Sequence, residues 1–355
     1  MRVAFFGSSL VSAYWNGACT YYRGIVRALA DRGHDVTFYE PDVLDRQSHR
    51  DIPDPEWATV VVYRAETEDD VVETVARARG ADLVVKASGV GAFDDVLERE
   101  VLEVAGDRSL CAFWDVDAPA TLGRMEADPD DSLRKLVPAY DLVLTYGGGD
   151  PVVRRYEALG ARSCVPIYNA LDPTTHFPVE PDPRFAADLS FLGNRLPDRE
   201  ARVEEFFFRA VDAAPGRSFL LGGAGWDDRV AGMQNLSYAG HVSPQDHNAL
   251  NCSAMAVLNV SRESMAANGF SPATRVFEAA GAGACLITDA WVGIETFLQP
   301  DEEVLVAHDG AEVAAALEGL TPERARSIGD AARERIVSEH TYAHRAAELE
   351  ELLAR

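Results

Sequence analysis

Short apolar runs rich in β-branched residues alternate with amphipathic stretches along the chain. After "VAFF" near the amino end comes "TYYRGIVRALADRG", where Tyr22, Ile25, Val26 and Leu29 recur at helical spacing and Gly33 ends the pattern. Continuous apolar strands separated by helices are typical of parallel sheets covered on both faces. The pattern therefore predicts a doubly wound α/β fold, repeated twice. The predicted strands are "VAFF", "DVTFY", "TVVVY", "DLVVKA", "SLCAFW", "DLVLTY", "SCVPIY", "DLSFLG", "SFLLGG", "LSYAG", "AMAVLNV", "ACLITD" and "EVLVA".

The length of 355 residues also favours two domains, because single cores rarely grow that large. The proline-rich, acidic stretch "NALDPTTHFPVEPDPRFAAD" has no periodicity and predicts an interdomain linker. We expect Rossmann-like domains over residues 1–170 and 171–340, with the C-terminal helix 341–355 packing back on the first. Such sheets bind ligands at the carboxyl ends of their strands, so a cleft between the domains is expected.

The charge balance narrows the classes of partner. With 58 acidic and 33 basic residues the net charge is −25, which disfavours binding to nucleic acid or anionic lipid. No apolar run reaches the length of a membrane span. The five cysteines are scattered in apolar surroundings, as expected of reduced, buried thiols. We expect a soluble, cytoplasmic protein, and the sequence leaves its oligomeric state open.

Several cofactor signatures are missing. The first strand is followed by "GSSLVSAYWNG" rather than GxGxxG, and neither a P-loop nor a GxSxG elbow occurs. His340 and His344 have the spacing of a metal pair, but no third ligand is visible. The sequence therefore predicts no cofactor and no metal.

The segment "FSPATRVFEAAGAGACLITD" is the strongest candidate for chemistry. Ser271 is a suitable N-cap and Pro272 a suitable first helical residue, so a helix is predicted to begin there and offer its free N–H groups to an anion. Arg275 lies in the first turn and Glu278 one turn further on the same face. The arrangement suits a diphosphate at the helix tip and a ribose at Glu278. The alternative is an ordinary i,i+3 ion pair.

A second loop, "SFLGNRLPDRE", follows the first strand of the second domain. In this topology it opens onto the same edge of the sheet, so Arg195 and Arg199 can neutralise the same diphosphate. Arg195, being nearer the strand end, is the preferred candidate; Arg199 has the alternative of a solvated helix start.

The chain resembles CgeB-like glycosyltransferases of the GT-B superfamily. The likeness is carried by "FSPATRVFEAAGAGACLITD", together with "WNGACTYYRGIVRALADRGHDVTFYE", "FWDVDAPATL", "YNALDP", "YAGHV", "LNVSRESM" and "SEHTYAHRAAELE". The resemblance implies two Rossmann-like domains, a nucleotide-sugar donor in the C-terminal domain and an acceptor facing the N-terminal domain. No metal is demanded, since arginines and a helix dipole can hold the diphosphate.

The resemblance also suggests roles for single residues. It places Glu278 on the donor ribose, Arg275 and the turn at Ser271 near the phosphates, and the loop Gly240, His241 and Val242 at the nucleobase edge. Related retaining enzymes often carry Glu in an EGFG-like turn where this chain has Asn268, Gly269 and Phe270. We expect the sugar or acceptor to contact this turn, and the sequence leaves retention and inversion open.

The first domain is expected to supply the acceptor side. Asn16 and Gly17 lie in the loop after the first strand, which in this fold faces the cleft. Asp115 and Asp117 end a later strand, and either can be a general base in an inverting mechanism. The alternative is that one of them bonds the following turn. In a retaining mechanism the donor phosphate can take the proton instead.

The leading hypothesis is transfer of a sugar from a nucleoside-diphosphate sugar, most simply a UDP-sugar, to a small-molecule or glycan acceptor. A nucleotide-sugar epimerase on the same fold and a non-catalytic nucleotide-sugar-binding protein are the alternatives. The sequence names neither the sugar nor the acceptor.

Overall fold

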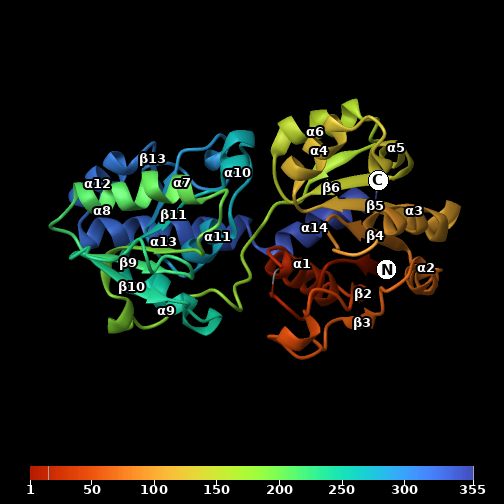
Figure 1. Ribbon diagram of the computed structural model, residues 1–355, viewed down its shortest axis with the longest axis horizontal. Helices are drawn as coiled ribbons and strands as arrows, with labels where there is room; N and C mark the ends of the chain where they lie inside the picture. The colour runs from red at the N-terminus through yellow and green to blue at the C-terminus, as the bar shows by residue number, and fades with distance from the viewer. Residues whose placement is uncertain (15, 355) are drawn as a thin grey trace. The chain divides into compact units, whose positions relative to one another are not determined.

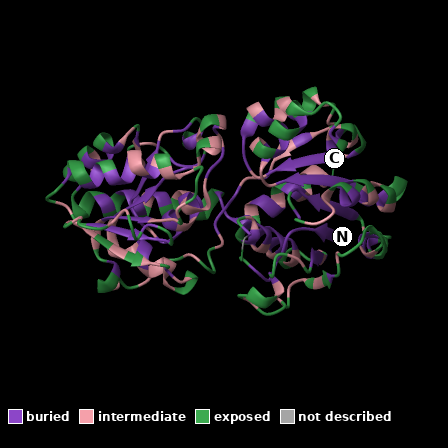
Figure 2. Ribbon diagram, in the orientation of Figure 1, coloured by how far each residue is buried: buried purple, intermediate pink, exposed green. Residues whose placement is uncertain are grey.

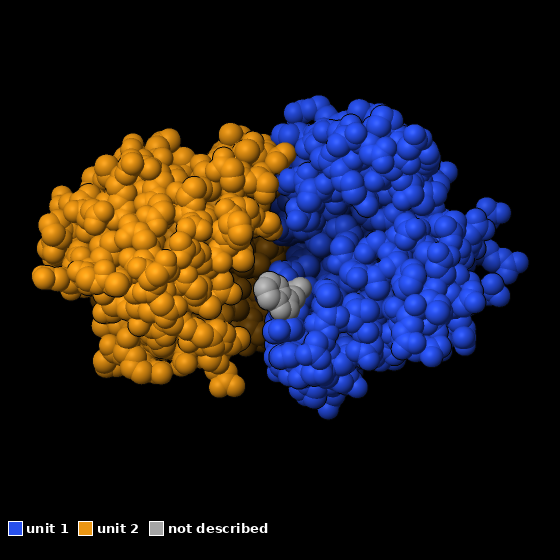
Figure 3. Space-filling model, in the orientation of Figure 1, with its two compact units in different colours: residues 1–168, 342–355 blue, residues 169–341 orange. Residues whose placement is uncertain are grey.

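The computed structural model describes residues 1–14 and 16–354 and divides the chain into two compact units (Figures 1 and 3). Unit 1 comprises residues 1–168 and 342–355, and unit 2 residues 169–341. Each unit has one parallel sheet, whose strands lie among the buried residues (Figure 2). The doubly wound α/β fold predicted from the apolar pattern is confirmed, and every predicted strand is present.

Unit 1 has, within the described residues, a seven-stranded sheet in the order β3-β2-β1-β4-β5-β6-β7. Its strands are β1 Arg2–Phe6, β2 Asp35–Pro41, β3 Thr59–Tyr63, β4 Leu83–Ala87, β5 Leu110–Asp115, β6 Leu142–Thr145 and β7 Cys164–Pro166. Its helices are α1 Cys19–Asp31, α2 Glu68–Val75, α3 Asp94–Ala105, α4 Ala118–Ala127, α5 Ser132–Leu136, α6 Gly149–Ala158 and α14 Tyr342–Leu353.

Strand alternation gives this sheet two buried faces. Ala4 and Phe6 of β1 point into the core shared with α2 and α3, whereas Phe5 between them packs against Tyr22 of α1 with ring centroids 5.5 Å apart. The helix α14 lies against α1 so closely that a Cβ at Gly24 would come 2.2 Å from the ring of Tyr342. The end of the chain is thus part of unit 1.

Unit 2 has, in the part of the chain described, a six-stranded sheet in the order β10-β9-β8-β11-β12-β13. Its strands are β8 Ala187–Leu192, β9 Phe219–Gly222, β10 Leu236–Gly240, β11 Ala254–Asn259, β12 Leu286–Asp289 and β13 Leu305–Ala307. Its helices are α7 Glu200–Val203, α8 Arg209–Ala213, α9 His247–Ser253, α10 Glu263–Asn268, α11 Thr274–Gly281, α12 Gly310–Gly319 and α13 Pro322–Glu339.

The proline-rich stretch predicted to be a linker is docked on unit 2 instead. Asp182 N donates to Ser253 Oγ over 2.7 Å, Val179 N donates to Cys252 Sγ over 3.4 Å, and Arg184 pairs with Asp246. Two side chains at the end of α9 thus accept hydrogen bonds from backbone N–H groups of this stretch that no helix or strand satisfies. The segment belongs to unit 2, and through it a histidine reaches the candidate site.

Candidate functional site

Three glycine-containing loops meet at the carboxyl edge of the unit 2 sheet. Gly193 N donates to Gly222 O over 2.9 Å, and Gly223 N donates to Gly240 O over 2.6 Å. Gly223 has φ +116°, and a Cβ there would lie 2.2 Å from Gly193 O. Only glycine fits at such a contact. The loops after β8, β9 and β10 are therefore held backbone to backbone, and the β9 loop connects the predicted nucleobase loop Gly240–Val242 to the arginine loop after β8.

Helix α11 begins near the same edge, because the chain passes from the carboxyl end of β11 through α10 and α11 to the amino end of the parallel strand β12. It begins at Thr274 after an extended Ala273, so the predicted cap at Ser271 is wrong. Ser271 Oγ instead donates to Gly269 O over 2.9 Å within the preceding turn. The hydroxyl of Ser271 thus stabilises the turn before the helix rather than the helix itself. Arg275 lies in the first turn of α11.

The preceding turn is strained. Phe270 has φ +47°, a left-handed conformation that non-glycine residues rarely adopt, and Phe270 N donates to Val292 O over 2.6 Å. A Cβ at Gly293 would lie 2.3 Å from the Phe270 ring. Asn268 Nδ2 donates to Ser264 O. The predicted contact turn is thus fixed in an unusual geometry beside α11, as is common at functional sites.

Glu278 and Arg275 lie side by side on α11 without being hydrogen-bonded. Glu278 Oε2 is 3.8 Å from Arg275 Nη1, and its Oε1 is 3.9 Å from His176 Nε2. Both side chains of the helical pair are 14% exposed. Among the described residues none donates a hydrogen bond to the Glu278 carboxylate. Its lone pairs are available to a ligand.

The charge of Glu278 is stabilised by its neighbours. Burial raises the pKa of Glu278, but Arg275, His176 and His247 together outweigh burial and hold that pKa below its usual value. The carboxylate is therefore ionised at neutral pH. An ionised, mostly buried carboxylate without a donor suits two adjacent hydroxyls better than it suits a structural role.

His247, the first residue of α9, joins the predicted nucleobase loop to this pair. Burial, and next Arg275, lower its pKa to about 4, while Glu278 and a hydrogen bond to the Val242 backbone act in the opposite direction. The imidazole is neutral at pH 7. Sequence reasoning missed both His247 and His176, because neither lies in a motif and only the fold brings them to Glu278.

The two arginines of the loop after β8 differ in their contacts. Arg195 pairs with Glu200 at 2.5 Å and Asp228 at 2.8 Å, and its guanidinium lies over the Trp226 ring. Arg199 Nε is buried without a hydrogen-bond partner in the described structure.

Arg199 also has cationic neighbours. Its pKa is lowered by burial and then by Arg262 and Arg275, so these guanidinium groups lie close enough to repel one another. A Cβ at Gly193 would be 2.9 Å from Arg199 Nη1, which places this guanidinium over the glycine loop. The geometry favours Arg199 over Arg195 as an anion ligand, the reverse of the preference drawn from sequence.

In unit 1 the structure separates the two aspartates after β5. Asp115 is completely buried and accepts hydrogen bonds from Ser88 Oγ, Thr121 Oγ1, Tyr156 Oη and the Asp117 backbone N–H, at 2.5–3.0 Å. Burial raises its pKa despite these bonds. The Asp117 carboxylate is half-buried and, within the described residues, makes no hydrogen bond or ion pair. Of the two predicted bases, only Asp117 offers its carboxylate.

The side chain of Asn16 forms hydrogen bonds within the loop after β1. It is buried, accepts from Ser8 Oγ, and donates to the carbonyl oxygens of Ser9 and Ser12. Gly17 beside it is exposed, and none of the described residues has an atom within 4 Å of a Cβ built there. Asn16 shapes the loop after β1, and Gly17 leaves its tip open.

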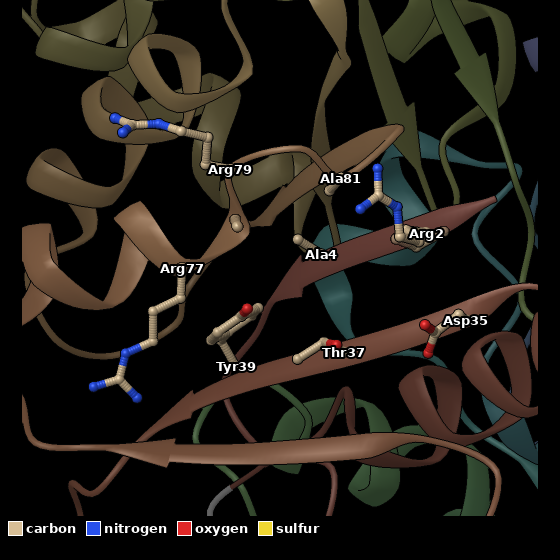
Figure 4. A pocket seen from close by; sticks show the side chains of 10 residues that line it. Arg2, Ala4, Asp35, Thr37, Tyr39, Arg77, Arg79 and Ala81 are labelled. Carbon is tan, nitrogen blue, oxygen red and sulfur yellow. The ribbon is translucent and has the colours of Figure 1, made fainter.

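A separate pocket of about 120 Å³ lies at the amino ends of β1 and β2, away from the edge that carries these loops (Figure 4). Arg2, Arg77 and Arg79 line it but point in different directions. Since the guanidinium groups do not converge, we assign no ligand to it. Within the described residues no three His, Cys, Asp or Glu side chains are grouped to hold a metal ion, and no helix has the length and hydropathy needed to cross a membrane.

Known structures share this architecture over the whole chain. Sucrose-phosphate synthase from Thermosynechococcus elongatus aligns with a TM-score of 0.74 at 15% identity, covering 100% of this chain and 98% of that one. Anabaena HepE in complex with UDP-glucose aligns with a TM-score of 0.65 at 15% identity, covering 100% and 99%. The fold is GT-B.

A further structure shares the GT-B fold, and a family model matches part of the chain. AviGT4, a glycosyltransferase involved in avilamycin A biosynthesis, aligns with a TM-score of 0.62 at 17% identity, covering 99% of this chain and 96% of that one. A family model described as glycosyl transferase-like matches residues 199–351. No curated protein sequence matches the chain. The GT-B architecture and the family model together support a glycosyltransferase; the CgeB-like subfamily is a resemblance of sequence motifs alone.

Proposed function

We propose that the protein transfers a sugar from a UDP-sugar to a small-molecule or glycan acceptor, with the donor bound by unit 2. The observation that carries this proposal is the ionised Glu278 carboxylate, which has no hydrogen-bond donor in the described residues and lies 3.8 Å from Arg275 at the start of α11. HepE, which shares the fold, binds UDP-glucose. Glu278 then accepts hydrogen bonds from the ribose hydroxyls, and the loop Gly240–Val242 holds the uracil edge.

The diphosphate is assigned to the arginines at the same edge. Arg275 and Arg199 are close enough to repel one another, so an anion between them relieves that repulsion. Negative charge develops on the diphosphate as the glycosidic bond breaks, and preorganised guanidinium groups stabilise it in the transition state. Ser271 and Arg195 contribute less, because their side chains already have partners.

The acceptor is assigned to unit 1, at the loop containing Gly17 and at Asp117. For an inverting reaction Asp117 is the proposed base, since its carboxylate is open whereas that of Asp115 is occupied. For a retaining reaction the donor phosphate takes the acceptor proton. The anomeric configuration of the product distinguishes the two.

Isothermal titration with UDP tests the donor assignment. The wild type should bind UDP, and Glu278→Gln should bind it at least tenfold more weakly, since a neutral amide accepts weaker hydrogen bonds from the ribose. Equal UDP affinity in the two proteins would sink the assignment. Incubation with UDP-glucose alone should yield no isomer; a new UDP-hexose would point to an epimerase.

A further inference from the structure

Asn251 on α9 is a fully buried polar residue that is hydrogen-bonded to Arg275 of the Arg275–Glu278 pair. Its Oδ1 accepts a hydrogen bond from Arg275 Nη1 over 3.3 Å. Its Nδ2 is also buried and has no hydrogen-bond partner in the described structure. An unsatisfied buried amide destabilises a fold. Packing alone therefore does not explain an asparagine here.

The contact with Asn251 bears on the distance between Arg275 and Glu278. Their charged groups are 3.8 Å apart, too far for a hydrogen bond. A guanidinium and a carboxylate one helical turn apart and screened from water attract each other strongly and normally close to about 2.8 Å. In this structure Arg275 instead donates to the neutral amide of Asn251.

We propose that Asn251 is a positioning residue that keeps Arg275 from closing onto Glu278. The guanidinium then stays free for the diphosphate, and the carboxylate stays free for the ribose. This role rests on the proposed donor site. The test therefore distinguishes a wrong role for Asn251 from a wrong donor site.

The test is a double-mutant cycle with UDP as titrant, measured by calorimetry. Asn251→Leu should weaken UDP binding about tenfold, because Arg275 then pairs with Glu278. Asn251→Asp should weaken it at least as much, because a carboxylate captures Arg275 in an ion pair. In an Arg275→Ala background, Asn251→Leu should have no further effect. A purely structural role would give the same loss in both backgrounds.

Asn235→Leu is the matched control in the same unit. Asn235 Nδ2 donates to the carbonyl oxygens of Val211 and Ala214, so its loss should lower Tm while UDP affinity stays within about twofold. If Asn251→Leu and Asn251→Asp bind UDP as tightly as the wild type does, the positioning role is overturned. If the wild type binds no UDP, the proposed donor site fails and the inference fails with it.

Discussion

Asp115 in unit 1 is a completely buried carboxylate and Glu278 in unit 2 a mostly buried one, both near the carboxyl edge of a parallel sheet, but their neighbours differ. Asp115 accepts four hydrogen bonds from neutral donors, which fill its lone pairs. Glu278 has cationic and imidazole neighbours at 3.8 Å and 3.9 Å and, within the described residues, no donor. The pKa of Asp115 is raised, and that of Glu278 is lowered.

The difference separates a structural carboxylate from one prepared for a ligand. Hydrogen bonds from fixed neutral groups satisfy Asp115 and hold β5 to α4 and α6, so nothing remains for a substrate to gain. Charges placed just beyond hydrogen-bond distance keep Glu278 ionised while leaving its oxygens open.

Arg275→Ala gives the sharpest test of the unit 2 side of this comparison. We expect kcat at saturating donor to fall about 100-fold, equivalent to about 2.7 kcal/mol of transition-state stabilisation, and Tm to fall only modestly, because Glu278 and Asn251 also lose a neighbour. Turnover of a UDP-sugar is the measurement, and thermal unfolding is the control. An unaltered rate at saturating donor would contradict the diphosphate role.

Asp115→Ala tests the unit 1 side. Removing the carboxylate leaves the hydroxyl donors of Ser88 and Tyr156 unsatisfied, whereas Thr121 Oγ1 keeps the Asp117 carbonyl oxygen as an acceptor, so unit 1 should lose about 2 kcal/mol of unfolding free energy. Chemical denaturation measures that loss, and UDP affinity should not change. Asp117→Asn should behave oppositely, with normal stability and slower turnover if the reaction inverts. A stable but inactive Asp115→Ala would reverse the assignment of the base.

Arg199 and Arg195 form a matched pair within one loop. Arg199→Ala should weaken UDP binding about tenfold, because the guanidinium of Arg199 has a buried Nε without a partner in the described structure and lies near the positive charge of Arg275. Arg195→Ala should weaken it less than about threefold, since Glu200 and Asp228 already hold that side chain. Equal losses in calorimetry would show that the ion pairs of Arg195 open for the ligand.

Glu98 on α3 should make the stability of unit 1 depend on pH. Its carboxylate lies 3.8 Å from Lys86 Nζ, yet burial raises its pKa to about 7, above that of the unfolded chain. Protonated Glu98 therefore favours the folded state, and this contribution is complete below the unfolded pKa and lost as pH rises through about 7. Glu98→Gln should reduce the loss of stability between pH 5 and pH 8 by about 2.5 kcal/mol, since each pKa unit is equivalent to about 1.4 kcal/mol. If the unfolding free energy of both proteins, measured by chemical denaturation, changes by the same amount between pH 5 and pH 8, the prediction is wrong.

Local sequence signals located the strands and the pair on α11, but they misplaced what depends on distant contacts. The cap at Ser271 fits the local pattern, yet Phe270 is bonded to Val292 and the helix starts only at Thr274. The preference for Arg195 followed its place near the strand end. Its acidic partner Asp228 lies 33 positions away, and no periodicity reveals that pairing.

The alternation of apolar runs determined the α/β architecture and its strands, because burial between two layers of helices favours apolar residues at most positions of the central strands. The helical spacing of Arg275 and Glu278 likewise placed them on one face. Only the tertiary structure decided which polar groups are occupied and which are open. Asp115 accepts hydrogen bonds from groups in the loop after β4, in α4 and in α6, whereas His176, His247 and Asn251 lie near the α11 pair and come from segments distant in sequence. Hydrogen bonds and electrostatic interactions act over a few ångströms in space, and proximity of that kind is not encoded in local pattern.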